Sequence, residues 1–353
     1  MRLCASFGTF SLLFTMFPRI VALICAATAI SARAAVITRQ SEQRPLQTIF
    51  QFPDQHWIEN QAVRRNGDLL ANDLGQYRTY LVDPTQLGVE PKTLYQFPQG
   101  TILTGIAEVE EDVFYVSAQQ GYIYTFSIQP NASTIYKIDL RSYARTHKPL
   151  VSKLVDIPSA QFLNGMTLLN RRDGTLLLSD SQQGVIYRLN TRTREYEIVV
   201  DDPYLKGPSA FPGFGVNGIR VSGNQLYIAN VGFGRIARAP VSLRTGRLTG
   251  PITIISDQVS NADDFAVDER DGSVFLARNT ARTLSRVFLD GRVETVAGSP
   301  NSTELIGPVA AVLGRGKSKG KLIVSTDGVT TDASGVPLTT AGKIVSLDVR
   351  DCL

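Results

Sequence analysis

Acidic and amide side chains recur along this chain at points where a short apolar run begins. Glu59, Asn164, Asn217 and Asp263 each stand at such a point. Carboxylate and amide oxygens are hard ligands of the kind that Ca²⁺ takes in proteins. Clustered carboxylates without a cation would raise one another's pKa and cost stability. If the fold brings these four residues together, they predict a calcium site.

Side-chain hydrogen bonds to the backbone are the alternative role for such residues. Asn-Gly at 164–165 and 217–218 and Asp-Asp at 263–264 can cap strand entries in that way. This alternative fits any single position. It explains less well why Glu59, which is not a turn former, opens the first segment.

Hydrolysis at such a site would need a base that activates water as well as the cation. Asp263 or Asp264 could be that base, and His56 near Glu59 is another candidate. A plain loop residue is the commoner role for a histidine at this kind of position.

Aromatic residues gather near the same segments. Loop aromatics more often serve packing than binding, but five of them near one end of the segments predict an apolar substrate-binding surface. The five are Trp57, Tyr77, Phe211, Phe214 and Phe233.

A repeated unit must position these residues. It consists of a polar residue, a short apolar strand, a tight turn, a second strand ending in a polar residue, and a third strand. Six units start at residues 60, 104, 164, 217, 263 and 307, and the spacings of 44 to 60 residues leave room for a fourth strand. Six such units predict an all-β fold, a six-bladed β-propeller with four-stranded antiparallel blades. A β-sandwich would not repeat the motif in phase.

Two consequences follow from the propeller. The segment 46–52 precedes the first unit and is expected to supply the outer strand of the last blade, which closes the ring. The first residues of the innermost strands should surround one mouth of the central channel. That ring comprises Glu59, Thr104, Asn164, Asn217, Asp263 and the Gly307 position.

Residues 1–34 predict a secretory signal peptide. Met16–Arg19 is a short basic region, 20–30 is apolar, and Ala32-Arg33-Ala34 is a cleavage signal. Pro18 and Arg19 interrupt the apolar stretch, so neither half reaches the ~20 residues that a membrane span needs. Translation could also begin at Met16. We expect a secreted protein with a lead-in at 35–45 and a propeller at 46–353, and no membrane association after cleavage.

Cleavage changes the charge and the cysteine count. The formal charge falls from +4 to +1, because three arginines and no acidic residue are lost. Only Cys352 remains, so no internal disulfide is expected.

Asn131 and Asn301 lie in glycosylation sequons. The basic run at 317–321 falls on a predicted turn, so a small molecule is expected as partner and not a nucleic acid. The propeller closes on itself, so a monomer is expected.

The mouth residues resemble a known family. Glu59, Asn164-Gly, Asn217-Gly-Ile and Asp263 resemble the calcium ligands of the gluconolactonase–regucalcin family and of paraoxonases. The stretches 217–229 and 263–272 carry most of this resemblance. It implies a bound Ca²⁺ and hydrolysis of a lactone or ester.

A longer set of motifs resembles a group of secreted fungal propellers of secondary metabolism. Some members are hetero-Diels–Alderases, which join an o-quinone methide derived from a tropolone or polyketide to a terpene alkene such as humulene. The resemblance implies an apolar pocket that holds both reactants, a hydrogen-bond donor for the quinone-methide oxygen, and no organic cofactor. Arg278 and Asn279 could be that donor. The motifs lie at 57–64, 105–109, 112–114, 162–167, 215–219, 263–267, 297–303 and 307–308.

Three functions therefore stay open. The first is a pericyclase of the hetero-Diels–Alderase kind, and the second is a calcium-dependent lactonase. The third is a non-catalytic binding propeller, which the short predicted turns on the opposite face argue against.

Overall fold

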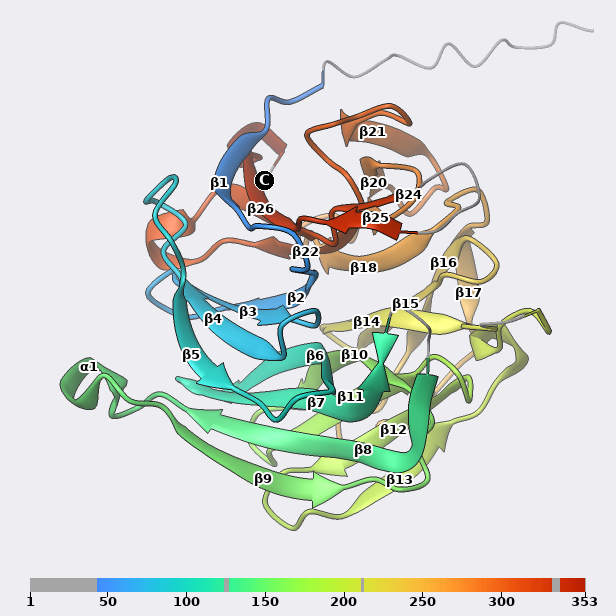
Figure 1. Cartoon of the computed structure of the whole chain (residues 1–353). Coiled ribbons are helices and arrows are strands. Elements are labelled where there is room, and N and C mark those ends of the chain that lie inside the picture. Colours follow the sequence, from blue (N-terminus) through green and yellow to red (C-terminus); the bar gives the residue numbers. More distant parts are fainter. Residues whose placement is uncertain (1–42, 124–126, 211–212, 332–336, 353) are drawn as a thin grey trace, which may run out of the picture. The chain divides into compact units, whose positions relative to one another are not determined.

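The computed structural model describes residues 43–123, 127–210, 213–331 and 337–352, all within a compact unit that spans residues 40–353. It confirms the predicted all-β fold: six four-stranded antiparallel sheets, each a blade, are arranged around a central channel (Figure 1). The predicted signal peptide at 1–34 lies outside the described residues and stays a prediction.

Blades one to three use consecutive strands of the chain. Blade one comprises β2 (Ile58–Val63), β3 (Leu69–Asp73), β4 (Arg78–Val82) and β5 (Lys92–Gln96). Blade two comprises β6 (Thr101–Glu110), β7 (Val113–Tyr122), β8 (Ser127–Asp139) and β9 (Leu150–Asp156). Blade three comprises β10 (Leu163–Asn170), β11 (Thr175–Asp180), β12 (Val185–Asn190) and β13 (Tyr196–Val200).

Blades four and five repeat this order, and blade six departs from it. Blade four comprises β14 (Val216–Ser222), β15 (Gln225–Asn230), β16 (Arg235–Pro240) and β17 (Thr253–Ser256). Blade five comprises β18 (Ala262–Val267), β19 (Val274–Arg278), β20 (Thr283–Val287) and β21 (Val293–Gly298). Blade six comprises β22 (Pro308–Leu313), β23 (Lys321–Thr326), β26 (Lys343–Asp348) and β1 (Gln47–Gln51), and a hairpin of β24 (Val329–Thr331) and β25 (Pro337–Thr340) is inserted before β26.

The N-terminal strand closes the ring as predicted. β1 pairs antiparallel with β26, so the outermost strand of blade six comes from the start of the propeller. Ile49 of this strand is fully buried in an apolar cluster with residues of blades one and six, among them Ile58 and Ile323. Closure therefore buries apolar surface as well as removing a free strand edge.

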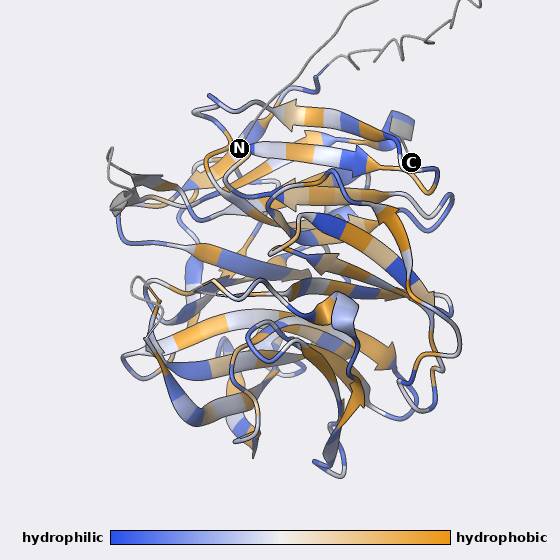
Figure 2. Ribbon diagram, turned by 90° about the vertical axis from the view of Figure 1, so that its right-hand side faces the viewer, coloured by the Kyte–Doolittle hydropathy of each residue, from blue (hydrophilic) through white to orange (hydrophobic). Residues whose placement is uncertain are grey.

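Alternating side chains build the core between the blades. Successive residues of a strand point to opposite faces, and Figure 2 shows apolar and polar bands that alternate along many strands. The inner strands β2 and β18 are almost wholly buried on both faces, polar residues included, because each blade packs between two others. In the described residues the helical elements are one four-residue α-helix, α1 (Tyr143–Thr146), and the 3₁₀ turns Pro203–Leu205, Gly316–Ser318 and Arg350–Cys352. No helix there is long and apolar enough to cross a membrane.

Glycines follow the polar residues at the mouth because the inner strands approach one another very closely there. A Cβ atom on Gly105 would lie 2.3 Å from the backbone oxygen of Asn164, and one on Gly165 would lie 2.5 Å from that of Asn217. A Cβ on Gly218 would lie 2.4 Å from Oδ1 of Asp264. The Asn-Gly pairs are thus not turns, because they stand inside β10 and β14 and allow tight packing around the channel.

Replacing Gly165 with alanine should therefore be costly. Its nearest obstacle is backbone, which cannot rotate away, so we expect the free energy of unfolding to fall by about 1–3 kcal/mol. Gly250→Ala is a suitable control, because its new Cβ would meet only the ring of Pro240. Urea unfolding of both variants tests this, and an equal loss for both would contradict the explanation.

Candidate functional site

Four polar residues predicted from the repeat lie at the mouth where the inner strands begin. Glu59 is in β2, Asn164 in β10, Asn217 in β14 and Asp263 in β18. Each is buried but keeps 5–8% of its surface exposed. Asn217 forms a side-chain hydrogen bond with Asp263. Three members of the predicted set, Glu59, Asn217 and Asp263, therefore form one electrostatically linked group.

Burial raises the pKa values of the carboxyl groups at this mouth. Burial first, and then the neighbouring Asp327 and Asp264, raise the pKa of Glu59 to about 7. Burial and the negative charges of Glu59, Asp264 and Asp327 raise the pKa of Asp263 well above its usual value. Burial raises the pKa of Asp327 to about 6, although hydrogen bonds from Val329 and Asn279 oppose that shift. The group can hold protons near neutral pH, or it can exchange them for a cation.

Asp327 was not predicted as a site residue. It follows β23, and its Oδ2 accepts a hydrogen bond from the predicted donor Asn279 at 2.8 Å. Gly307 is required opposite it, because a Cβ there would lie 1.7 Å from Oδ1 of Asp327 and φ is +61°. The sequence carried one signal for it, since the second strands of units one and three end at Asp73 and Asp180, and Asp327 directly follows that of unit six.

Asp264 is engaged differently from Asp263. Its Oδ2 accepts hydrogen bonds from Asn60 at 2.9 Å and from the Arg220 guanidinium at 2.8 Å, while its Oδ1 accepts the backbone N–H of Phe265 at 2.7 Å. Asp264 is in blade five, so the bond from Arg220 joins it to the neighbouring blade four, while the bond from Asn60 of blade one crosses the channel. Of the two predicted bases, the geometry favours Asp263, because both oxygens of Asp264 are already used.

His56 pairs with a buried aspartate. Its Nδ1 lies 2.6 Å from Oδ2 of Asp73, and its ring stacks on Phe52 with centroids 5.4 Å apart. Asp73 Oδ1 also accepts the backbone N–H groups of Trp57 and Gln76. In blade three, Asp180 accepts the corresponding backbone N–H groups, those of Phe162 and Gln183, without any histidine. Asp73 thus caps the entry to β2, and His56 is an addition to that cap.

Two of the predicted aromatics, Trp57 and Phe214, meet in an apolar cluster at the mouth. Trp57 donates its indole N–H to Oε2 of Glu59 at 2.5 Å. Phe214 stacks on Phe162 at a centroid distance of 4.9 Å and 14° between the rings. The cluster joins blades one and two to the loops before blades three and four. We call it the mouth cluster; its members are Trp57, Leu74, Ile102, Ile123, Ile128, Phe162 and Phe214.

The predicted aromatics Tyr77 and Phe233 are not members of the mouth cluster. Tyr77 packs in the core between blades one and two, with Phe97 and Leu70, and the structure does not place it in the mouth cluster. Phe233 is half exposed, and the Arg235 guanidinium lies over its ring at 4.8 Å. Phe211 lies outside the described residues.

The predicted donor Arg278, at the end of β19, is held by the loop that precedes β18 of the same blade. Its Nε and Nη2 bond to the carbonyl and hydroxyl oxygens of Ser260, at 3.1 and 2.9 Å. Together with the bond from Asn279 to Asp327, this means that both predicted donors have partners within the protein. A substrate oxygen would have to compete for them.

The predicted calcium site depends on amides as much as on carboxylates. Among the residues that the structure describes, no three His, Cys, Asp or Glu side chains are arranged to hold a metal ion. The predicted ligand set contains only Glu59 and Asp263 of these types, and the amides Asn164 and Asn217 would have to complete it. Calcium binding stays a prediction.

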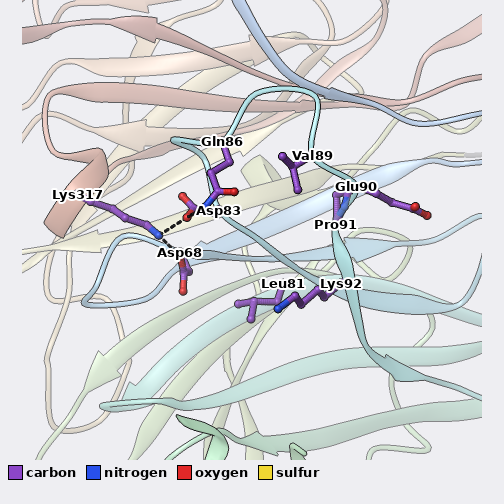
Figure 3. Close-up of a pocket in the computed structure, with 9 residues that line it drawn as sticks. All are labelled: Asp68, Leu81, Asp83, Gln86, Val89, Glu90, Pro91, Lys92 and Lys317. Carbon is purple, nitrogen blue, oxygen red and sulfur yellow. Dashed lines mark hydrogen bonds and ion pairs between the residues drawn. The ribbon is translucent and has the colours of Figure 1, made fainter. Parts of the chain in front are cut away.

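A separate cavity lies away from this mouth. It has a volume of about 240 Å³ and lies between the outer turn of blade one and a turn of blade six (Figure 3). Nζ of Lys317 contacts Asp68 and Asp83, each at 2.7 Å. Lys317 begins the basic run at 317–321, and here it links blade six to blade one instead of presenting a free charge.

Asn131 and Asn301 of the two sequons are exposed.

Comparison with known proteins supports the resemblance seen in the motifs. No protein-family model matches the chain. A candidate hetero-Diels–Alderase from Phoma sp. is 25% identical over 317 residues, which is 81% of this chain and 88% of that protein. A second one, asR5 from Sarocladium schorii, is 25% identical over 319 residues, 80% of this chain and 78% of that protein.

Solved structures show the same fold at low identity. A luciferin-regenerating enzyme has a TM-score of 0.61 at 12% identity and covers 86% of this chain and 95% of its own. Regucalcin from Agrobacterium tumefaciens has a TM-score of 0.56 at 12% identity, with 86% and 91% covered. Virginiamycin B lyase from Staphylococcus aureus has a TM-score of 0.52 at 13% identity, with 87% and 99% covered. The resemblance to hetero-Diels–Alderases and to regucalcin-like propellers is thus confirmed, and at this identity the structures show the fold alone.

Proposed function

We propose that this protein is a pericyclase of secondary metabolism that catalyses a hetero-Diels–Alder reaction between an o-quinone methide and a terpene alkene. Two named relatives match about 80% of the chain. The observation that carries the proposal furthest is the mouth cluster, where an apolar surface around Trp57 directly adjoins a buried polar group at Glu59. A cycloaddition of a polar diene with a hydrocarbon needs both kinds of surface.

The reaction needs no nucleophile and no group transfer. Trp57, Phe162 and Phe214 would hold the two reactants against one another, which replaces a bimolecular encounter with an oriented complex. Negative charge develops on the quinone-methide oxygen as the ring aromatises. A donor at that oxygen lowers the barrier.

Glu59 is the best-placed donor. Its pKa of about 7 leaves a large neutral fraction at neutral pH, and Trp57 fixes one carboxyl oxygen so that the other can carry the proton. Asn279 and Arg278 are alternatives that would first have to leave Asp327 and Ser260.

The test is a direct one. Purified protein is mixed with humulene and an o-quinone methide released in situ, and the cycloadduct is followed against the uncatalysed reaction. We expect one stereoisomer in excess, unchanged by EDTA. Trp57→Ala should lower kcat/KM by about 10²-fold, since both orientation and the position of Glu59 depend on it. Phe233→Ala is the matched control. A racemic product at the uncatalysed rate would reject the proposal.

The second candidate is a calcium-dependent lactonase. Its specific support is the link from Glu59 through Asp263 to Asn217, which could hold Ca²⁺ with Asn164. The cation would polarise a lactone carbonyl, and Asp263 or His56 would be the candidate base. Lactone hydrolysis that is lost with EDTA and restored by Ca²⁺ would favour this function over the pericyclase.

The remaining expectations belong with either function. We propose a secreted, glycosylated monomer that acts on small apolar molecules, with no organic cofactor and no nucleic-acid or membrane partner. Secretion with N-glycans on Asn131 and Asn301 can be checked by the mass of the mature protein before and after glycosidase treatment.

A further inference from the structure

Blade two is longer than its neighbour at the mouth. Its strands β7 and β8 have 10 and 13 residues, while the corresponding strands β11 and β12 of blade three have six each. The extra length extends the hairpin beyond the edge of the blade. In Figure 1 the far ends of β7 and β8 turn away from the blade, toward the middle of the ring.

A bulge produces this turn. Gln119 pairs with Ser133 and Gly121 pairs with Ile128, so one residue of β7 faces four of β8. Asn131 within the bulge has φ of +59°. Bulges bend a strand and redirect the side chains that follow. Gly121 is required at the bend, because a Cβ there would lie 2.5 Å from the backbone oxygen of Ser127.

The bend delivers apolar side chains to the candidate site. Ile123 and Ile128 join the mouth cluster with Trp57, Phe162 and Phe214. Ile123 is buried and Ile128 is half-buried, so Ile128 is the one with surface left for a ligand. Tyr122 beside them is 51% exposed. We call Tyr122, Ile123, Ser127 and Ile128 the β7–β8 tip.

We propose that the β7–β8 tip is the wall of the site that selects the hydrocarbon reactant by size. This rests on the proposed function, because it assigns the alkene to the mouth cluster. The cluster contains no charged side chain, so the chemistry that it recognises is a hydrocarbon surface. Trp57, Ile128 and Phe214 are the half-buried members of the mouth cluster, so they carry its remaining exposed apolar surface. A fifteen-carbon alkene needs more of that surface than a five-carbon alkene does, so a change at Ile128 should affect the larger molecule more.

Trp57 offers a readout that does not depend on turnover. It is the only tryptophan in the chain, so its fluorescence reports binding in the mouth cluster. Humulene should quench it. Ile128→Phe should weaken humulene binding at least 10-fold and change binding of isoprene less than 2-fold. Ile198→Phe, on the outer strand of blade three and 39% exposed, is the control and should change neither.

The outcomes separate the two proposals. If no cycloadduct ever forms but Ile128→Phe selectively weakens humulene binding, the role of the β7–β8 tip is supported and the proposed pericyclase activity is rejected. If cycloadduct forms while Ile128→Phe and Ile198→Phe bind humulene equally well, the role of the β7–β8 tip is rejected and the proposed pericyclase activity is supported. If Ile128→Phe does not fold, Ile128→Ala replaces it, and an unchanged humulene affinity in that variant overturns the wall.

Discussion

Replacing Arg220 with methionine is expected to lower the free energy of unfolding by about 3–5 kcal/mol. The guanidinium donates to Oδ2 of Asp264 at 2.8 Å, and Asp264 is only 2% exposed. Without Arg220 a buried carboxylate would lose its cation and keep only the amide of Asn60 and one backbone N–H. Since domains have a total stability of about 5–15 kcal/mol, this loss would be a large share of it.

A double-mutant cycle gives the prediction its control. Asp264→Asn in the Arg220→Met background removes the unpaired charge and should recover much of the loss. Arg65→Met is the matched surface variant, because Arg65 pairs with Glu111 while its side chain is 77% exposed, and solvent screening leaves such a pair little effect on stability. Urea unfolding at pH 7 measures four variants, namely Arg220→Met, Asp264→Asn, the double variant and Arg65→Met. A loss for Arg220→Met no larger than that for Arg65→Met would contradict the buried-pair interpretation.

The period of the sequence accounts for how far the fold was predictable. The polar residue that opens each unit and the turn after its first strand together predict six blades. The strand before Glu59 belongs to none of these units, so only the last blade is left for it to pair with. The same period aligned Glu59, Asn217 and Asp263, because equivalent positions in successive blades must surround one axis. These three residues could therefore be predicted from the repeat alone, whereas Asp327, which follows a second strand, was not.

Side-chain contacts between blades could not be predicted in that way. Asp263 and Asp264 are adjacent and chemically identical, and only the presence of Arg220 on the inner strand of another blade separates their roles. Tyr77 and Trp57 likewise looked equivalent, yet Tyr77 packs between blades one and two. These outcomes depend on the side chain that happens to lie opposite, which no period encodes.

The extra length of the β7–β8 hairpin is visible in the spacing of the repeats. The second unit is followed by the longest spacing, 60 residues, and the added length lies largely in β7 and β8. An insertion within a repeat usually maps to the functional face of a propeller. Its placement over Trp57 still required the bulge at Asn131, which the sequence does not reveal.

Glu59 should make the protein less stable as the pH rises when no divalent cation is present. Its pKa is raised from 4.5 to about 7 in the folded state. Folded protein therefore holds a proton that unfolded protein releases, so the stabilisation is complete below pH 4.5 and is lost as the pH rises toward 7. Asp327, with a pKa of about 6, adds a loss of the same sign. The Glu59 contribution is on the order of 3 kcal/mol.

Glu59→Gln should make this profile shallower, because the amide has no proton to lose while Asp327 still contributes. Thermal unfolding in EDTA between pH 4.5 and 8 tests this, with the 59% exposed Glu111→Gln as a control that should keep the wild-type slope. A wild-type profile that is already flat would mean that Glu59 is not held as a neutral acid.

The same unfolding experiment with added Ca²⁺ distinguishes the two candidate functions. If Glu59, Asn164, Asn217 and Asp263 bind Ca²⁺, the cation replaces the protons, and Ca²⁺ at about 100 times its Kd should stabilise the wild type at pH 8 by about 2.7 kcal/mol. Glu59→Gln should lose most of that gain. If Ca²⁺ leaves the wild-type Tm unchanged, the carboxyl group of Glu59 is free to act as a hydrogen-bond donor near neutral pH, which the cycloaddition needs and the lactonase does not.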